Sequence, residues 1–483
     1  MTDRSSSWPR LRQGSPQPPE WKDDRTVAPS DTAVPRSLDD PRSPDSPRSL
    51  DSPPRFRSFT SRHLDRLTAR AGLSAEQRLA VRAVAEVLPF RTNSHVVEEL
   101  IDWSAAPDDP IYRLIFPQED MLPAADVARI ADLLRSDAPH KEIRTVAHQV
   151  RMRLNPHPAG QLELNRPALD GRRLDGMQHK YRETLLFFPR QAQTCHAYCS
   201  YCFRWAQFVG EEELRIAADG DSELLVDYLR AHPEITNVLF TGGDPMVLSP
   251  AVLRRYVEPL LALDQIESIR VGTKVLAFWP RKFVSDPGAD DLLRLLEQVV
   301  AAGKNMALMA HFSHPRELAP PVVEQAVARI RDTGAVIRTQ APLIRTINDD
   351  ARVWASMWRR QVRLGMVPYY MFVERDTGPV DYFAVPLARA YRIFRDAYAD
   401  VPGLARTVRG PSMSATPGKV AVDGVVELLG QKVFALHMIQ ARDPALVGRP
   451  FYAHYDPAAV WLDDLKPAFD DRFPFDEPAE ALL

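Results

Sequence analysis

The sequence has little of three things that would class a protein at once: cysteine, excess charge and long apolar runs. A net charge of −3 over 483 residues offers no basic surface for a polyanion, so nucleic acid is not an expected partner. No apolar run reaches the roughly 18 residues of a membrane span, and the N-terminus MTDRSSSWPRLRQGSPQ lacks the apolar core of a secretory signal. Three cysteines are an odd number and therefore a poor disulfide framework. Free thiols are typical of a reducing compartment. We therefore predict a cytoplasmic protein with no membrane partner.

The composition changes along the chain and predicts four parts. Residues 1–57 hold 11 of the 43 prolines and few large apolar side chains, which predicts a disordered tail rich in Pro, Ser, Arg and Asp. In residues 58–175 apolar residues recur three and four positions apart, as in LSAEQRLAVRAVAEVL, which predicts a helical N-terminal region. Residues 176–400 alternate short apolar runs with amphipathic segments and are the expected catalytic core. Residues 401–483 are turn-rich, with one expected hairpin and a tail without a clear period.

Six apolar runs in the core are predicted strands: ETLLFF, TNVLFTG, ESIRVGT, NMALMAHF, AVIRTQAPLI and VPYYMFV. The segments between them carry helix signals, such as Ser249-Pro250 at one start and Gly303, Gly334 and Gly365 at three ends. Six βα units predict an α/β fold with a parallel sheet and helices outside it. Because eight units close a barrel, six predict an open, partial (β/α)6 TIM-like barrel, with its chemistry at the C-terminal ends of the strands.

The three cysteines follow the first predicted strand as Cys195, Cys199 and Cys202, a C-x3-C-x2-C spacing. Three thiolates in one loop suit three corners of a [4Fe–4S] cluster. The chain has no fourth cysteine, so one iron would stay open to a small ligand with N and O donors. The alternatives are inert thiols or a zinc site completed by His196, although zinc sites usually have two separated ligand pairs. We predict the cluster.

This spacing, with an aromatic residue before the last cysteine, resembles the radical S-adenosylmethionine superfamily. The resemblance implies that the open iron binds S-adenosylmethionine and that its reductive cleavage releases a 5′-deoxyadenosyl radical. Gly242, Gly243 and Asp244, in TGGDP, close the second strand, where the superfamily binds the methionyl amino group. Two glycines let a backbone approach a ligand closely, although GGDP alone would be an ordinary turn.

The resemblance narrows to the lysine 2,3-aminomutase family over residues 178–422. The matching segments are HKY, CFR, FTGGDP, IRVGTK, HFSHP, RTQAPLIRTINDD and PYY, in that order. The family resemblance implies pyridoxal 5′-phosphate beside the radical chemistry. It also implies that hydrogen is removed from C3 of the bound amino acid and that nitrogen moves from C2 to C3 through an azacyclopropyl radical. The product is a β-amino acid.

The resemblance also assigns residues to the pyridoxal cofactor. Pro417-Gly418-Lys419 takes the place of the family's cofactor lysine, which implies that Lys419 is catalytic and binds the cofactor through an internal aldimine. The family's glycine run before this lysine is absent here. Lys180 and Tyr181 match positions that hold the cofactor phosphate, and a cation with a phenol donor suits a phosphate. The alternatives are a lysine in an exposed turn and solvated residues before a strand.

Substrate contacts follow from the same resemblance. Arg204 matches the arginine that binds the substrate α-carboxylate, and His311 and Gln340 match residues near the S-adenosylmethionine site. Arg375 stands where lysine-specific enzymes carry an aspartate for the distal ammonium. This reversal of charge predicts a glutamate-like substrate, unless a one-residue shift brings a neighbouring carboxylate, Glu374 or Asp376, into the pocket.

The sequence therefore predicts an isomerase: a radical S-adenosylmethionine, pyridoxal phosphate-dependent 2,3-aminomutase for an acidic or polar L-α-amino acid. It needs an electron donor such as flavodoxin or ferredoxin, and it leaves homo-oligomers open. The alternatives are a lysine 2,3-aminomutase acting on free lysine or on a lysine of a partner protein, and a pyridoxal-independent radical enzyme. A non-catalytic electron carrier would have no use for GGDP or Arg204. No zinc is predicted, because the C-terminal part has no cysteine.

Overall fold

The computed structural model describes residues 55–161, 163–215 and 218–476. These residues belong to one compact unit. The predicted disordered tail, residues 1–57, lies outside the described residues up to residue 54. No helix in the described part of the chain is both long enough and apolar enough to cross a membrane.

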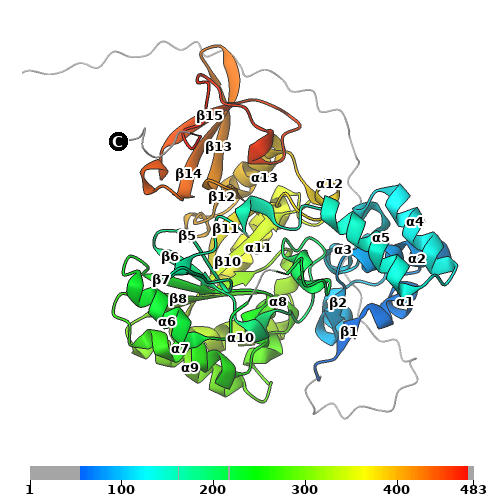
Figure 1. The fold of residues 1–483 in the computed structure, drawn as a ribbon, viewed down its shortest axis with the longest axis horizontal. Coiled ribbons are helices and arrows are strands. Elements are labelled where there is room, and N and C mark those ends of the chain that lie inside the picture. Colours follow the sequence, from blue (N-terminus) through cyan, green and yellow to red (C-terminus); the bar gives the residue numbers. More distant parts are fainter. Residues whose placement is uncertain (1–54, 162, 216–217, 477–483) are drawn as a thin grey trace, which may run out of the picture. The chain divides into compact units, whose positions relative to one another are not determined.

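A helical region precedes the main sheet (Figure 1). Its helices are α1 (Ser61–Arg70), α2 (Ala75–Val87), α3 (Pro110–Ile115), α4 (Ala124–Arg135) and α5 (His140–Arg153). Two strand pairs flank them, β1 (Ser58–Thr60) with β2 (Arg91–Asn93) and β3 (Ala168–Leu169) with β4 (Arg172–Arg173). Helix α2 begins at a capping residue, since the Ser74 hydroxyl accepts a hydrogen bond from the Gln77 amide. This region is important for the site because it supports the cysteine loop.

The main sheet has eleven strands in the order β15-β14-β13-β12-β11-β10-β9-β8-β7-β6-β5 (Figure 1). Its central strands are parallel, and six of them are the predicted ones: β6 (Thr184–Phe187), β7 (Asn237–Phe240), β8 (Ser268–Thr273), β9 (Asn305–His311), β10 (Val336–Leu343) and β11 (Val367–Val373). The strand order runs between two edges, β15 and β5, as in an open barrel. The α/β fold class is therefore confirmed.

Helices connect the parallel strands and bury an apolar face against them. They are α6 (Ser222–Ala231), α7 (Pro250–Leu261), α8 (Val275–Phe278), α9 (Ala289–Ala301), α10 (Pro321–Asp332), α11 (Ala351–Arg363), α12 (Val380–Phe383) and α13 (Leu387–Ala399). Ser249 caps α7, as its sequence indicates. The glycines predicted to end three helices all have positive φ, between 77° and 82°, which side chains disfavour.

Further strands extend the sheet beyond the prediction. The short strand β12 (Arg409–Ser414) adds a seventh parallel strand beside β11. It is followed by the expected hairpin of β13 (Gly418–Leu428) and β14 (Gln431–Ala441), and then by β15 (Pro450–His454). At the other edge, β5 (Met177–Tyr181) pairs antiparallel with β6. Lys180 and Tyr181 therefore lie in a strand of the sheet and do not precede it.

Candidate active site

A cavity of about 300 Å³ opens at the C-terminal ends of the parallel strands. Its lining includes the cysteine loop, the residues that follow β7 and β8, the end of β11 and Lys419 of β13. All of the predicted site residues line this cavity except Lys180 and Tyr181. The fold thus brings the predicted cluster ligands and the predicted cofactor lysine, which are more than two hundred residues apart in sequence, into one cavity.

The cysteine loop runs from the end of β6 to a short helix, η5 (Trp205–Phe208). The helical region holds its backbone: Tyr198 N donates to Arg91 O at 2.9 Å, and Ser200 N donates to Leu114 O at 2.8 Å. Within the loop, Cys202 N donates to Cys199 O at 3.1 Å. These bonds hold the backbone that carries the three sulfur atoms.

The charge state of the thiols fits metal binding. Loss of water raises the pKa of Cys199 to about 12 and of Cys202 to about 11, and it raises the pKa of Cys195 well above its usual range. Metal cations replace the thiol protons and offset the cost of burying thiolates. Three sulfurs on one loop, in a chain with no fourth cysteine, therefore fit a cluster with one open iron.

The GGDP segment packs on the cysteine loop. Gly243 N donates to Ala192 O at 3.0 Å, and Asp244 N donates to Thr194 O at 2.7 Å. Both carboxylate oxygens of Asp244 accept hydrogen bonds from Thr273 Oγ1, at 2.7 and 2.9 Å. Asp244 thus ties the β7 loop to β8. The backbone at Gly243 therefore approaches the segment that leads into the cysteine loop. The sequence did not indicate this role.

Gly243→Ala should damage the cluster site. A Cβ on Gly243 would lie 2.2 Å from the carbonyl oxygen of Thr194, and backbone cannot yield there without moving the cysteine loop. Overpacking of this kind costs about 1–3 kcal/mol. We expect a lower thermal midpoint and less iron per chain after anaerobic reconstitution. Gly272→Ala is the matched control, because its Cβ would meet no atom closer than 3.7 Å. Equal iron content in both variants would contradict this expectation.

His311 and Gln340 lie side by side in the cavity. The Gln340 amide donates to His311 Nε2 at 2.8 Å. Burial, with Lys274 nearby, lowers the pKa of His311 to about 3, so the ring is neutral at physiological pH. The pair therefore offers neutral polar atoms to a ligand.

Lys274 is a cavity residue that we did not predict. Its ammonium forms an ion pair with the buried Glu317 at 2.7 Å and donates to Ser313 Oγ at 3.2 Å. Ser313 in turn contacts the Tyr201 hydroxyl of the cysteine loop at 2.9 Å. This chain of contacts ties the cysteine loop to the segments that follow β8 and β9. Lys274 and Ser313 both lie in segments that match the family, IRVGTK and HFSHP, and this match is the sequence feature that could have identified them.

Lys419 has the surroundings of a reactive lysine. Its Nζ lies 4.2 Å from the centroid of the Tyr370 ring and donates to Gln440 Oε1 at 3.2 Å. Burial, together with the charges of Arg270 and Arg409, lowers the pKa of Lys419 to about 7. A large fraction of this amine is therefore uncharged, and nucleophilic, near neutral pH.

Lys180 and Tyr181 lie on β5, outside the cavity lining. The Lys180 ammonium donates to the Ala415 carbonyl, close to the β12–β13 turn. Burial lowers the pKa of Lys180 to about 6, and the charges of Arg442, Arg375 and Lys419 contribute. Burial raises the pKa of Tyr181. Charged groups of the cavity, such as Arg375, affect the pKa of both residues. Their contact with a phosphate stays a prediction.

Two guanidinium groups occupy the cavity beside one ring. Arg204 Cζ lies 5.0 Å and Arg375 Cζ lies 5.2 Å from the centroid of Phe203. In the described part of the chain neither forms an ion pair with a carboxylate, and Nε and Nη2 of Arg375 are buried without a hydrogen-bond partner. Burial lowers the pKa of Arg204 to about 10, which leaves it charged. The pair is suited to bind anionic groups.

The carboxylates next to Arg375 do not reverse this charge. Asp376 does not line the cavity, and its backbone oxygen accepts a hydrogen bond from Asn155 Nδ2 at 2.6 Å. Glu374 does line the cavity, but burial raises its pKa well above the usual range, which favours its neutral form. Of the two carboxyl groups beside Arg375, only Glu374 thus reaches the cavity, where burial favours its neutral form.

The relatives of this chain decide its family. It is 30% identical over 390 residues to a protein of Aquifex aeolicus named "Putative L-lysine 2,3-aminomutase", and the alignment covers 80% of this chain and 91% of the relative. The chain belongs to the lysine 2,3-aminomutase family. The L-lysine 2,3-aminomutase of Escherichia coli is 25% identical over 252 residues, covering 51% of this chain and 68% of the relative. That of Haemophilus influenzae is 25% identical over 240 residues, covering 48% and 66%.

Other comparisons are less informative. A radical SAM methyltransferase from Sphaerobacter thermophilus aligns with a TM-score of 0.34 and 15% identity, over 59% of this chain and 93% of that chain. No family model matches the chain. Membership of the lysine 2,3-aminomutase family confirms the predicted class, a radical S-adenosylmethionine aminomutase and hence an isomerase. The family implies a [4Fe–4S] cluster and S-adenosylmethionine.

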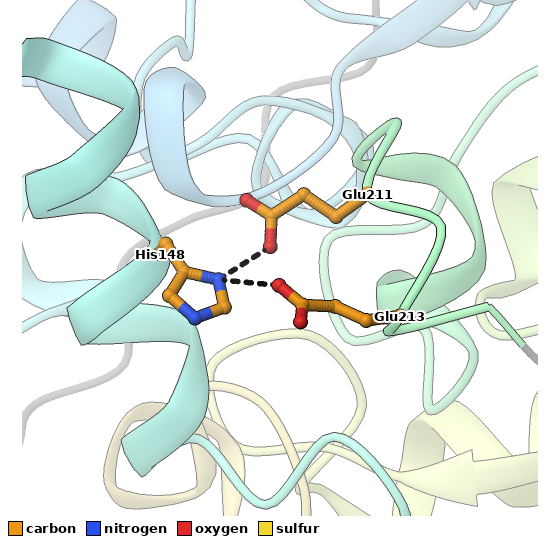
Figure 2. Close-up of side chains that lie close together, drawn as sticks. All are labelled: His148, Glu211 and Glu213. Carbon is orange, nitrogen blue, oxygen red and sulfur yellow. Dashed lines mark hydrogen bonds and ion pairs between the residues drawn. The ribbon is translucent and has the colours of Figure 1, made fainter. Parts of the chain in front are cut away.

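A second group of metal-ligand type lies outside this cavity (Figure 2). His148 Nδ1 of α5 is 2.7 Å from Glu211 Oε2 and 3.4 Å from Glu213 Oε1. The other oxygen of Glu211 pairs with Arg151, and the Glu213 side chain is 70% exposed. Ion pairs account for this arrangement, which links α5 to the segment that follows the cysteine loop.

Proposed function

We propose that the chain is a radical S-adenosylmethionine, pyridoxal phosphate-dependent 2,3-aminomutase that converts an acidic L-α-amino acid, glutamate or a close analogue, into a β-amino acid. The observation that carries this proposal is the shared cavity, which is lined by three cluster cysteines, by Lys419 and by two unpaired arginines. Each of these groups serves a different requirement of the reaction. Their meeting in one cavity supports a single site more strongly than any of them does alone.

The cysteine side of the cavity would hold the cluster and S-adenosylmethionine. Cys195, Cys199 and Cys202 are the cluster ligands in this proposal. The backbone at Gly242 and Gly243, with the neutral His311–Gln340 pair, offers hydrogen-bonding groups to S-adenosylmethionine. When bound, the reduced cluster supplies the electron that cleaves S-adenosylmethionine to a carbon radical. The cavity walls keep water away from that radical, since Tyr201 and Tyr198 are at most 9% exposed.

Lys419 would attach pyridoxal 5′-phosphate in the same cavity. Its partly neutral amine, held against Tyr370, is suited to react with an aldehyde. When bound, the cofactor supplies a carbon–nitrogen double bond across which the substrate nitrogen can migrate. Lys180 and Tyr181 are proposed to contribute to the phosphate site, as the family resemblance implies. The Ala415 carbonyl would have to release the Lys180 amino group for that contact.

The substrate would be held between the two arginines. Arg204 binds the α-carboxylate in this proposal, and Arg375 binds the carboxylate of the side chain. Both guanidiniums are unpaired within the described protein, so a dicarboxylic substrate would neutralise two charges that the protein leaves without partners. A lysine side chain would bring a third cation to the same place.

Arg375→Gln tests the substrate assignment. Loss of one partner of a desolvated charge pair costs about 2–5 kcal/mol, so kcat/KM for glutamate should fall at least about thirtyfold. Lysine turnover should not fall, because a repulsive charge is removed. Arg352→Gln is a matched control, since it removes the same charge from a side chain that is 89% exposed. Initial rates on glutamate, glutamine, aspartate and lysine under identical reducing conditions decide the matter. Efficient lysine turnover by the unaltered protein, with none on glutamate, would overturn the assignment.

Lysine is the second candidate substrate, because the relatives carry lysine in their names. In that case Glu374 is the carboxyl group available to the distal ammonium, and it would have to ionise. A lysine of a partner protein and a pyridoxal-independent reaction are further alternatives. Turnover of a free amino acid separates the first of them, and borohydride-trapped cofactor separates the second. We also propose a cytoplasmic location and an electron donor such as flavodoxin or ferredoxin.

A further inference from the structure

A group of arginines surrounds the two tyrosines of β11, beneath Lys419. Arg409 Cζ lies 4.6 Å from the centroid of Tyr369 and 5.3 Å from that of Tyr370, and Arg409 Nη1 donates to the Tyr370 hydroxyl at 3.1 Å. Arg338 Cζ lies 5.1 Å from Tyr369. Arg270 lines the cavity, and its Nε donates to Asn237 Oδ1 at 2.6 Å. None of these arginines forms an ion pair with a carboxylate of the described residues.

The Lys419 amine lies near these arginines, and no carboxylate among the described residues is in contact with it. The charged or titratable groups and other contacts that face its amine come from five strands: Lys180 of β5, Arg270 of β8, Tyr370 and Phe372 of β11, Arg409 of β12 and Gln440 of β14. Gln440 and Tyr370 are neutral, and burial raises the pKa of Tyr370 to about 12. No carboxylate is in contact with the Lys419 amine among the described residues. An ammonium at this position therefore meets cations without compensation.

We propose that Arg270 and Arg409 are positioning residues for Lys419: Arg409 holds Tyr370 against its amine, Arg270 lines the same cavity, and both set the reactivity of that amine towards an aldehyde. This inference rests on the proposed function only in that the aldehyde there is the cofactor. Arg409 acts through the Tyr370 hydroxyl, which fixes the ring on which the amine rests. Arg270 acts through the cavity, where its charge meets the amine across little water.

The chemistry needs an uncharged amine. The lone pair of the Lys419 nitrogen attacks the aldehyde carbon. The aldehyde oxygen then takes up the two amine protons and leaves as one molecule of water. A protonated amine has no lone pair to offer, so the fraction that is neutral at a given pH scales the rate. A nearby cation disfavours the ammonium form and lowers the pKa of the lysine. Without that cation the pKa rises, the neutral fraction near pH 7 falls and the reaction slows.

The test measures the titration of Lys419 directly. The protein is labelled with trace acetic anhydride from pH 5.5 to 9.5, and mass spectrometry compares the Lys419 peptide with the exposed Lys141 as internal reference. We expect a midpoint near 7 in the unaltered protein. Arg270→Gln should raise it by about one pH unit, which lowers the neutral fraction at pH 7 about fivefold, and Arg409→Gln should raise it by less. Arg270→Gln should have the larger effect, because Arg409 is more exposed and its charge is screened.

Two further variants distinguish this role from a structural one. Arg338→Gln removes the same charge from beside Tyr369, but Arg338 is not among the charges that lower the pKa of Lys419, so the midpoint should stay where it is. Arg409→Lys retains the positive charge and should restore most of the midpoint. If neither glutamine variant moves the midpoint, or if Arg338→Gln moves it as far, the proposal is wrong.

A second measurement on the same proteins keeps this inference separate from the proposed function. Pyridoxal phosphate is added at pH 7, and borohydride-trapped cofactor at Lys419 is followed over time. Trapping should be about fivefold slower in Arg270→Gln. A midpoint that moves as expected without trapped cofactor would support the positioning role and overturn the cofactor assignment. Cofactor trapped at equal rates in all variants, with an unmoved midpoint, would support the cofactor assignment and overturn the positioning role.

Discussion

Cys199→Ala should leave the protein without an iron–sulfur cluster and without any cleavage of S-adenosylmethionine. The chain has three cysteines, all in one loop, so no other thiolate can replace the missing ligand. Burial raises the pKa of the two remaining thiols, so their deprotonation is costly. Two metal–thiolate bonds would offset that cost less well than three. Iron and sulfide content, the visible absorbance of the cluster and 5′-deoxyadenosine formation after anaerobic reconstitution measure the loss.

Ser200→Ala is the control for this experiment. Ser200 lies beside Cys199 in the same loop, and its hydroxyl donates to the Arg113 carbonyl at 2.7 Å, a bond whose loss costs about 1 kcal/mol. This variant should keep a full cluster. A Cys199→Ala protein that retains both the cluster and S-adenosylmethionine cleavage would show that the three sulfurs are not the ligands.

Lys419→Ala should lose attached pyridoxal phosphate while it keeps the iron–sulfur spectrum. The substitution removes the amine that the cavity presents beside Tyr370, and it leaves the cysteine loop and its supporting bonds intact. We expect no borohydride-stable cofactor on this variant and no amino acid turnover. Lys466→Ala, at an exposed lysine of the C-terminal part, is the matched control and should bind cofactor normally.

Lys180 makes the site of attachment a real question. Burial lowers its pKa to about 6, so its amine is also largely neutral at pH 7. Mass spectrometry of the reduced, digested protein must therefore distinguish the two lysines. An adduct on Lys180 in the unaltered protein would contradict the role of Lys419. The absence of an adduct on either lysine would favour the pyridoxal-independent reaction.

The sequence predicted the central part of the sheet because the pattern there is local. A run such as VPYYMFV is apolar over a strand's length, and glycines such as Gly365 end the helices between the runs. Strand β12 was missed because RGPSMS contains Gly410 and Pro411 and has no period of its own. It becomes a strand by pairing with β11 on one side and with β13 on the other, and such partners are distant in sequence.

The site was predictable where a motif carries it and not where tertiary contacts do. Cys195, Asp244 and Arg204 were found through short patterns, and each of them lines the cavity. Arg270 lines the cavity from strand β8, in one lining with Lys419 of β13, and no spacing in the sequence reveals that these two residues share a cavity. The same holds for the Lys274–Glu317 ion pair, since Lys274 precedes helix α8 and Glu317 lies in the short helix Pro315–Leu318.

The most direct measurement incubates the reconstituted protein anaerobically with [U-13C]glutamate, S-adenosylmethionine, pyridoxal phosphate and a reductant. Moving nitrogen from C2 to C3 of glutamate gives 3-aminopentanedioate, which is symmetric about C3. We expect the five carbon resonances of glutamate to be replaced by three, and no change in lysine incubated in parallel. If 5′-deoxyadenosine forms with glutamate present while its carbon spectrum stays the same, and lysine rearranges instead, the assignment of an acidic substrate is contradicted.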